Sequence, residues 1–338
     1  MQNIKQTMYE KHHTQQEITA QLAEIHETMK REKIELSPEM QKYFNETLAR
    51  FTEGMTSGEM PVKKDLDEFI KTIKEYIENE RFLKDLEVQY QKRLETGAYF
   101  ELYDKDNPVV EGIDGKKYPA PTWDEIKQVI THKHVEKVKK YIKNPMLLVV
   151  PIAMPLEKIA LKVGAKKGKL PEQKPVEFTY DLYPDRSGDY PGEDIMVYFP
   201  ERYDKNNPGG LSKSDLLKLK GGFNKFPGWQ VLIVDGDDEV QNDSINKSAE
   251  DLLVENDTLG ITGITPEEWL ILHGSGVEEK GQPFDLNQWT LCMASYLKNL
   301  GTIPACIWGR LAFYATLHYY LPDDRSPGIG SRRSVRIW

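Results

Sequence analysis

Two cysteines, Cys292 and Cys306, are the only thiols in the 338-residue chain. So few cysteines exclude a disulfide-rich scaffold or a cysteine-rich zinc module and are typical of a reducing compartment, although one structural bridge stays open. Cys292 follows a helix-like pattern and Cys306 lies in a strand-like run. A catalytic pair would need a neighbouring base and an opening, so we favour two buried thiols that behave as small hydrophobes.

Metal-binding patterns are weak. The acidic stretch Asp235–Glu239 suggests calcium, but its spacing departs from the EF-hand loop and the closing glutamate is missing, so a solvated turn is favoured. His132 and His134 lie two positions apart on a predicted helix, where their side chains point to different faces. Phosphate loops, zinc-protease motifs and the nucleophile motif Gly-x-Ser-x-Gly are also absent from the sequence. We therefore expect no metal and no cofactor.

The most unusual stretch runs from Trp308 to Arg336 and is rich in aromatic side chains. Most strands alternate between core and solvent, yet this one carries aromatic or amphipathic residues on both faces, so one face should be exposed. Tyrosine provides a large contact area at a small cost in rotamer entropy. A strand buried on both sides explains the same pattern without a ligand. The candidate ligand-binding residues are Trp308, Arg310, Ala312, Phe313, Tyr314, Thr316, His318, Tyr319, Tyr320, Asp323, Asp324 and Arg325.

Charge argues against a general attraction to nucleic acid or to anionic membranes. The chain has 45 basic and 54 acidic residues, a net charge of -9. Lysines cluster on a predicted helix between Lys127 and Lys143 and again between Lys162 and Lys169, but without interleaved arginine or aromatic residues a solvated face is favoured. The longest apolar run, Pro145 to Pro155, is too short to span a bilayer, and the N-terminus lacks a signal-peptide core. We expect a cytoplasmic protein with no membrane or nucleic-acid partner.

Composition changes near residue 100. Residues 1–100 contain two prolines and three glycines, against 18 and 21 in the remaining 238. Apolar stripes at helical spacing predict a helical hairpin or small bundle in residues 1–100, with a helix N-cap at Ser37. These helices pack on each other or on the rest of the chain, or alternatively they form a coiled-coil arm that makes a homo-oligomer.

Residues 101–338 are predicted to form shorter helices and strands. Residues 101–144 form a helical connector, with one helix from Thr122 to about Lys143. Strand-length apolar runs follow at residues 147–154, 194–200 and 229–235, and Thr265 introduces a sharply capped helix. A further helix is predicted from Gln288 to Leu297, and strands at residues 303–318 and 334–337.

The C-terminal pattern consists of Ile303-Pro304-Ala305-Cys306-Ile307-Trp308, a tyrosine-rich stretch, and an ending with Gly330, Arg332 and Arg336 that is close to Gly-x-Arg-x-x-x-Arg. This pattern resembles the C-terminal end of variable proteins of diversity-generating retroelements. The resemblance extends upstream through Gly263 to Leu270 and Pro227 to Ile233, and more weakly to Pro151 to Lys158. It covers roughly residues 145–338 and leaves out the first 100.

That resemblance implies the fold and the role. Variable proteins of this family use a C-type-lectin fold of the formylglycine-generating-enzyme type as a scaffold for mutable surface residues. The expected fold is therefore α+β, an N-terminal helical region followed by a C-type-lectin-like domain over 145–338 with its variable region at 308–336. The implied function is non-catalytic binding of a protein or another macromolecule, with Arg332 and Arg336 mainly structural.

The alternative is an oxidoreductase of the formylglycine-generating, sulfatase-modifying type on the same fold. Such enzymes hold copper with a closely spaced pair of cysteines near the C-terminus. Cys292 and Cys306 are fourteen positions apart on different predicted elements, a departure that counts against the alternative. The sequence also lacks a lectin-type Glu-Pro-Asn calcium motif near the candidate surface.

Overall fold

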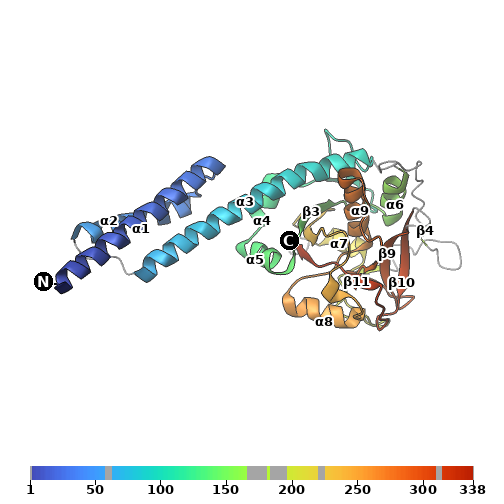
Figure 1. Cartoon of the computed structure of the whole chain (residues 1–338). Coiled ribbons are helices and arrows are strands. Elements are labelled where there is room, and N and C mark those ends of the chain that lie inside the picture. The colour runs from blue at the N-terminus through green and yellow to red at the C-terminus, as the bar shows by residue number, and fades with distance from the viewer. Residues whose placement is uncertain are drawn as a thin grey trace. The chain divides into compact units, whose positions relative to one another are not determined.

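The computed structural model describes residues 2–57, 63–165, 181–182, 196–219, 225–309 and 314–337, and it has a mixed α+β architecture (Figure 1). The chain divides into two compact units, Met1–Asp85 and Leu86–Trp338. The division falls inside helix α3 (Lys63–Tyr99), although the composition changes only near residue 100. The last turns of α3 belong to the second unit, where the Tyr90 hydroxyl donates to the Pro121 carbonyl at 2.8 Å.

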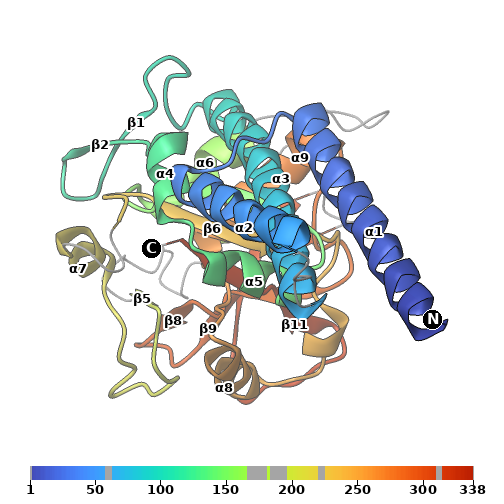
Figure 2. The same ribbon diagram turned by 90° about the vertical axis from the view of Figure 1, so that its left-hand side faces the viewer.

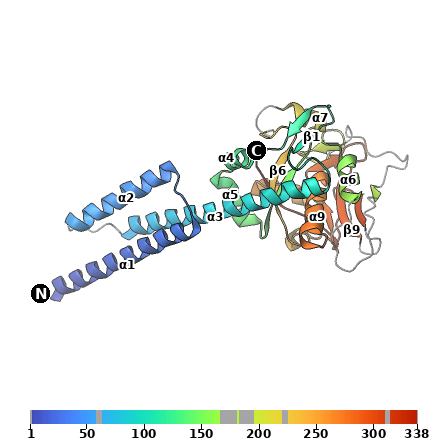
Figure 3. The same cartoon turned by 90° about the horizontal axis from the view of Figure 1, so that it is seen from above.

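The first unit consists of α1 (Gln2–Glu32), α2 (Pro38–Ser57) and the first part of α3, as Figure 3 shows. Its core gathers Ile25, Phe51, Phe69 and Ile73, and the ring of Phe69 lies 5.7 Å from that of Phe51. The Ser37 hydroxyl accepts the Met40 N–H at 3.2 Å and so caps α2. The predicted helices, apolar stripes and N-cap of this region are confirmed.

The predicted helix from Thr122 to Lys143 is wrong, because the structure has two helices there. They are α4 (Trp123–Val129) and α5 (His132–Tyr141). Ile130 has extended backbone (φ -66°, ψ 115°), and Thr131 starts the second helix as an N-cap whose hydroxyl accepts the His134 N–H. A second capping threonine stops the first helix, and apolar periodicity alone does not reveal such a break. A short hairpin of β1 (Val109–Glu111) and β2 (Lys117–Pro119) precedes α4.

A three-stranded antiparallel sheet confirms three of the predicted strands. Its order is β12-β6-β3, with β3 at Pro145–Val150, β6 at Gln230–Asp235 and β12 at Ser334–Arg336. Every residue of β6 is buried, so both faces of this strand are covered. A continuous apolar run without alternation is what such a doubly covered strand requires. A fourth predicted strand is also confirmed: it is β5 (Met196–Tyr198), which pairs with β8 (Ser295–Leu297).

A five-stranded mixed sheet holds the C-terminal elements. Its order is β11-β7-β9-β10-β4, formed by β11 (Ile329–Ser331), β7 (Trp289–Leu291), β9 (Ile303–Gly309), β10 (Tyr314–Tyr320) and β4 (Asp181–Leu182). The single strand predicted at residues 303–318 is wrong, because β9 and β10 are two strands that pair antiparallel with each other. The helix predicted from Gln288 to Leu297 is wrong, since β7 and β8 occupy that segment. The segment is buried at almost every position, and a short buried apolar run does not distinguish helix from strand by its periodicity.

Helix α9 (Pro266–Lys280) is the central element of the second unit. It contacts β3, β9 and helix α6 (Leu156–Ala165), and Figure 1 shows it beside α6. Thr265 and Glu268 form the predicted capping box: the Thr265 N–H donates to Glu268 Oε2 at 2.8 Å. All residues from Pro266 to Val277 are buried, including two glutamates and a histidine. A helix buried on all sides must pair its polar side chains internally.

The remaining elements surround this core in the second unit, as Figure 2 shows. They are α7 (Lys213–Lys218), the short 3-10 helix at Asn242–Ser244 and α8 (Ala249–Leu259). In the part of the chain that the structure describes, no helix combines the length and the apolarity that crossing a membrane requires.

Candidate functional site

The candidate surface centres on three aromatic rings on one face of the five-stranded sheet. His318 and Tyr320 of β10 lie with their ring centroids 5.5 Å apart, and the ring of Trp289 lies 5.7 Å from His318 and 5.9 Å from Tyr320. His318 is exposed, whereas Trp289 and Tyr320 are half-buried. We call these three residues the aromatic surface. The His318 ring is accessible, whereas the rings of Trp289 and Tyr320 pack partly buried against a core cluster that contains Ile303 and Ala305.

The strand register explains why these residues meet. Leu291 of β7 pairs with Ala305 of β9, which pairs with His318 of β10. Paired residues of an antiparallel ladder share a face, and so do residues two positions apart in one strand. Trp289 therefore joins His318 and Tyr320 from two strands away. Trp289 is not among the predicted surface residues, because the pattern around it predicted a helix.

The opposite face of β9 and β10 belongs to the core. Leu317 is buried, and Tyr319 packs against a cluster that contains Ile152 and Met196. Trp308 is only 3% exposed and stacks on His273 of α9, with ring centroids 5.1 Å apart. The prediction that Trp308 belongs to the ligand-binding surface is therefore wrong: strand alternation turns its ring toward α9.

The predicted rim follows β10. Asp323, Asp324 and Arg325 are exposed, and Arg325 makes an ion pair of 2.7 Å with Asp251 of α8. Burial, with a smaller effect of Asp324, raises the pKa of the Tyr320 hydroxyl, so this phenol stays neutral and can donate a hydrogen bond. Beside them Leu321 is 52% exposed. Apolar, aromatic and charged groups thus adjoin one another at this edge.

The structure places the other candidate residues only in part. Tyr314 and Thr316 lie in β10, where their backbones pair with Gly309 and Ile307. Arg310, Ala312 and Phe313 lie outside the described residues, as do Lys166, Lys167 and Lys169 of the second lysine cluster.

Two buried ion pairs hold the C-terminal strands beneath this surface. The guanidinium of Arg332 donates to Asp285 at 2.6 Å, and that of Arg336 donates to Glu268 at 2.8 Å. The side chains of all four residues are at most 1% exposed. The expectation that Arg332 and Arg336 are structural is confirmed. Gly330 fits the same region, because a Cβ there would lie 2.6 Å from a methyl of Val240.

Asp285 is the most connected of these buried groups. Its carboxylate accepts hydrogen bonds from the Trp269 indole at 2.7 Å, from the Thr290 hydroxyl at 2.6 Å and from Arg332. Its carbonyl accepts the Trp308 N–H at 3.0 Å, and its φ of 54° is one that Asp tolerates better than most residues. One side chain therefore ties α9, β7 and the C-terminal segment together.

The acidic stretch Asp235–Glu239 binds the side chain of Arg332 and is only partly exposed to solvent. Arg332 Nη1 donates to the carbonyls of Asp235 and Asp237 at 2.8 and 2.7 Å, and the Glu239 carboxylate accepts the Asn287 side-chain amide at 2.6 Å. The prediction of a solvated turn is therefore wrong at Asp235, which is buried. The guanidinium supplies the positive charge that a metal ion would supply in a calcium loop.

The two histidines of α5 contact different partners. His132 Nε2 lies 3.3 Å from Glu136, while His134 Nδ1 accepts the Thr131 N–H at 3.1 Å. Among the residues that the structure describes, no group of three or more His, Cys, Asp or Glu side chains is arranged to hold a metal ion.

The two cysteines meet in the core, contrary to what their separation suggested. The Sγ atoms of Cys292 and Cys306 lie 3.6 Å apart, because the β7 segment pairs with β9. Both thiols are buried, and burial raises the pKa of each, most strongly that of Cys292. Distance along the sequence was therefore a wrong argument against a cysteine pair, but neither thiol presents an accessible thiolate.

This burial predicts slow alkylation. Iodoacetamide attacks the thiolate, so both cysteines should react at least about 100-fold more slowly in the native protein than in the urea-unfolded chain at pH 8. Mass spectrometry of the two cysteine peptides after timed quenching measures the rates. Equal native and unfolded rates would contradict the buried placement.

No protein-family model, no curated protein and no solved structure matches the chain. The proposed function therefore depends on the geometry described above.

Proposed function

We propose that this chain is a non-catalytic ligand-binding protein that presents the aromatic surface on a C-type-lectin-like second unit, in the manner of variable proteins of diversity-generating retroelements. The observation that carries the proposal is the grouping of Trp289, His318 and Tyr320, from two strands, on one face of the sheet, with His318 exposed. Residues 308–336 are the variable region of this proposal.

The different exposure of side chains on the two faces of β10 supports the proposed binding function. His318 is exposed, whereas Leu317 and Tyr319 on the opposite face pack into the core. Substitution at position 318 therefore leaves the packing beneath it in place, whereas Tyr320 also packs against a core cluster. The buried ion pairs of Arg332 and Arg336 fasten the chain just after the surface. A scaffold for many alternative side chains needs this separation of display from stability.

The chemistry of the surface favours a macromolecular ligand, with a protein as the first candidate. Aromatic anchors surrounded by polar residues are the usual composition of binding hot spots, and the rings here are already braced by one another. Asp323, Asp324 and Arg325 supply a charged rim beside exposed Leu321. Preordered rings lose little rotamer entropy on binding.

Replacing His318 and Tyr320 together by alanine should remove binding while leaving the fold intact. Hot-spot truncation costs about 2 kcal/mol or more, roughly 30-fold in affinity for each residue. The full-length protein and the double variant are immobilised, and the macromolecules that each retains from a cell extract are compared. Tyr141→Ala on α5, half-buried in the same way as Tyr320, is the matched control.

Two outcomes would contradict the proposal. One is equal retention by the double variant and the unaltered protein. The other is a fall in melting temperature by more than about 10 °C in the double variant, which would assign these side chains to the core. A genomic observation adds an independent test: a neighbouring reverse-transcriptase gene and a repeat that matches the codons of residues 308–336 except at adenines.

The cysteine pair supports a second candidate, an oxidoreductase of the formylglycine-generating type. Its observation is the 3.6 Å distance between Cys292 Sγ and Cys306 Sγ. Soft thiolates are ligands that Cu(I) prefers. Copper analysis of the purified protein, together with binding of added Cu(I) to the protein and to Cys306→Ser, separates the two candidates. Copper bound by the unaltered protein and lost in the variant would favour the enzyme.

The first unit is proposed to make a homo-oligomer through its helices. The chain mass of 39.0 kDa makes the test direct, since sedimentation equilibrium should give a multiple of this value. A monomer mass at micromolar protein concentrations would contradict it.

A further inference from the structure

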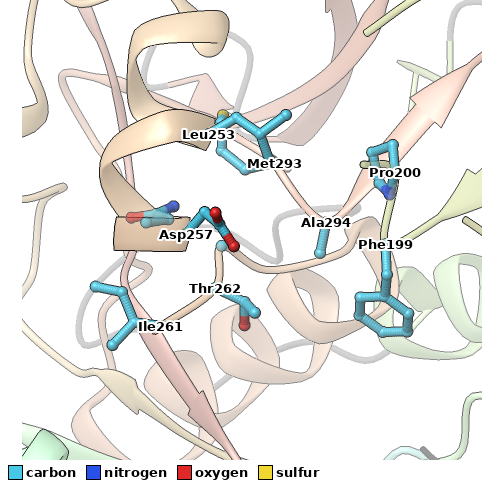
Figure 4. Close-up of a pocket in the computed structure, with 10 residues that line it drawn as sticks. Phe199, Pro200, Leu253, Asp257, Ile261, Thr262, Met293 and Ala294 are labelled. Atoms are coloured by element: carbon cyan, nitrogen blue, oxygen red, sulfur yellow. The ribbon is translucent and has the colours of Figure 1, made fainter. Parts of the chain in front are cut away.

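A second concave site lies in the second unit, apart from the aromatic surface. It is bounded by the end of α8, the segment Ile261–Gly263, and the pairs Phe199–Pro200 and Met293–Ala294 (Figure 4). Its volume is about 150 Å³. A cavity of about this size accommodates a group such as a benzene ring, so the site takes one side chain or an equally small apolar group.

The walls of the pocket are apolar and firmly held. Leu253, Ile261 and Met293 present aliphatic or thioether groups, and Met293 and Ile261 are themselves buried. Phe199 has a φ of 54°, uncommon for a bulky residue, and its N–H donates to the Ala294 carbonyl at 2.9 Å. The Arg336 guanidinium lies 4.5 Å from the centre of the Phe199 ring. One wall is thus held by the buried ion-pair network.

Asn256 lines this pocket, and its side chain carries an unsatisfied hydrogen-bond donor. The residue is only 4% exposed, and its side-chain Nδ2 has no hydrogen-bond partner. A buried amide donor without a partner costs free energy, and such groups are rare in folded proteins. A ligand oxygen that accepts from Asn256 Nδ2 would recover this cost, so the pocket favours an apolar group that carries a carbonyl.

Asp257 adds a negative charge at the same place. Figure 4 shows its carboxylate directed into the space between Leu253, Met293 and Thr262. Within the described parts of the chain no cation pairs with this exposed carboxylate, and the last turn of α8 contains no basic residue. Lys137 approaches the helix end, but its ammonium donates to the Gly260 carbonyl. The C-terminal end of a helix favours cations, so carboxylate and helix act in the same direction.

We propose that this pocket binds a ligand with a protonated amine, an adjacent apolar side chain and a carbonyl oxygen, which is the chemistry of an apolar amino-acid amide or of a peptide N-terminus. The amine pairs with Asp257, the carbonyl accepts from Asn256 Nδ2, and the side chain occupies the walls formed by Leu253, Ile261 and Met293. Free amino acids bind less well because their carboxylate is repelled by Asp257.

The test uses L-leucinamide and full-length protein labelled with ¹³C at the methionine methyl groups. The chain has ten methionines, and loss of one signal in Met293→Leu assigns the methyl group in the pocket. Adding L-leucinamide should shift the Met293 signal with a dissociation constant on the order of 1 mM, usual for so small a ligand. N-acetyl-leucinamide, which lacks the charge, and leucine, which carries a carboxylate, should each bind at least 10-fold more weakly.

Variants separate the two polar contacts. Asn256→Leu keeps the size of the side chain and removes the donor, and Asp257→Asn removes the charge; each should weaken L-leucinamide binding at least 10-fold. Glu250→Gln, an exposed carboxylate at the other end of α8, should leave binding unchanged. Leu-Gly-Gly amide distinguishes the sources: binding at least as tight as that of L-leucinamide indicates a peptide N-terminus, and no binding indicates a small free amine.

Three results would overturn the proposal. They are an unchanged Met293 signal at saturating L-leucinamide, equal affinity for the N-acetylated compound, and equal affinity of Asp257→Asn and the unaltered protein. Each variant must retain the methyl spectrum of the folded chain outside the pocket, so a failure to fold is recognised from the same measurement.

Discussion

Replacing Asp285 by alanine is expected to lower the free energy of unfolding by about 3–5 kcal/mol, the largest single-residue effect we expect in this chain. The substitution leaves the Arg332 guanidinium, which is fully buried, without its carboxylate. It also leaves the Trp269 indole N–H and the Thr290 hydroxyl without their acceptor. An uncompensated buried charge costs far more than the pair contributes, and two orphaned donors add to the loss. Urea denaturation followed by tryptophan fluorescence measures the change.

Two matched variants show whether burial is the cause. Arg325→Ala removes an ion pair of nearly the same length, 2.7 Å, whose side chains are 57% and 45% exposed, and it should cost less than about 1 kcal/mol. The double variant Asp285→Asn with Arg332→Met removes both charges and should recover part of the loss. A cost below about 1 kcal/mol for Asp285→Ala would contradict the assignment of Asp285 as the hub of the core.

Acid is expected to destabilise the protein through His273. Burial lowers the pKa of this imidazole to about 3, since it is enclosed between the rings of Trp269 and Trp308. In the unfolded chain the pKa returns to about 6.5. Above pH 6.5 the group is neutral in both states and stability does not depend on it. Between pH 6.5 and 3 only the unfolded state binds the proton, so the free energy of unfolding falls by about 1.4 kcal/mol per pH unit.

The comparison of variants isolates this contribution from that of other acids. His273→Gln cannot be protonated, so its stability should fall less steeply between pH 7 and pH 4.5, by about 2–3 kcal/mol over that range relative to the unaltered protein. His132→Gln, which changes a histidine exposed on α5, should keep the original slope. Identical slopes for the unaltered protein and His273→Gln would show that the ring is protonated in the native state.

Local patterns predicted much of the fold. The caps at Ser37 and Thr265 are where the spacing of Ser, Thr, Pro and Glu placed them, because the first turn of a helix needs those side chains. The strand β6 was predicted from its continuous apolar run, because a strand that is covered on both faces needs apolar side chains at successive positions. The break at Thr131 did not follow because apolar periodicity alone does not reveal a capping residue inside a helical pattern. The strands β7 and β8 did not follow because they depend on pairing with segments distant in sequence.

The candidate site shows the same limit. The richness of residues 308–325 in aromatic side chains fits either a surface with one open face or a strand buried on both sides, and it does not say which positions face outward. The sheet register decides this: Trp308 stacks on His273 in the core, while Trp289 joins His318 from another strand. The distance along the chain between Cys292 and Cys306 was misleading for the same reason.

The amino-acid sequence by itself determined the helical first unit, the capped central helix and the apolar strands, whereas the structural role of Arg332 and Arg336 was implied only by the resemblance. These helices and strands depend on contacts within a few turns. Only the tertiary structure decided which aromatic rings are exposed, that the two thiols lie 3.6 Å apart, and that Asn256 and Asp257 border one pocket. Each of these depends on which strands and helices become neighbours. The neighbours are those that minimise the free energy of the whole core, and a local sequence pattern carries no information about that free energy.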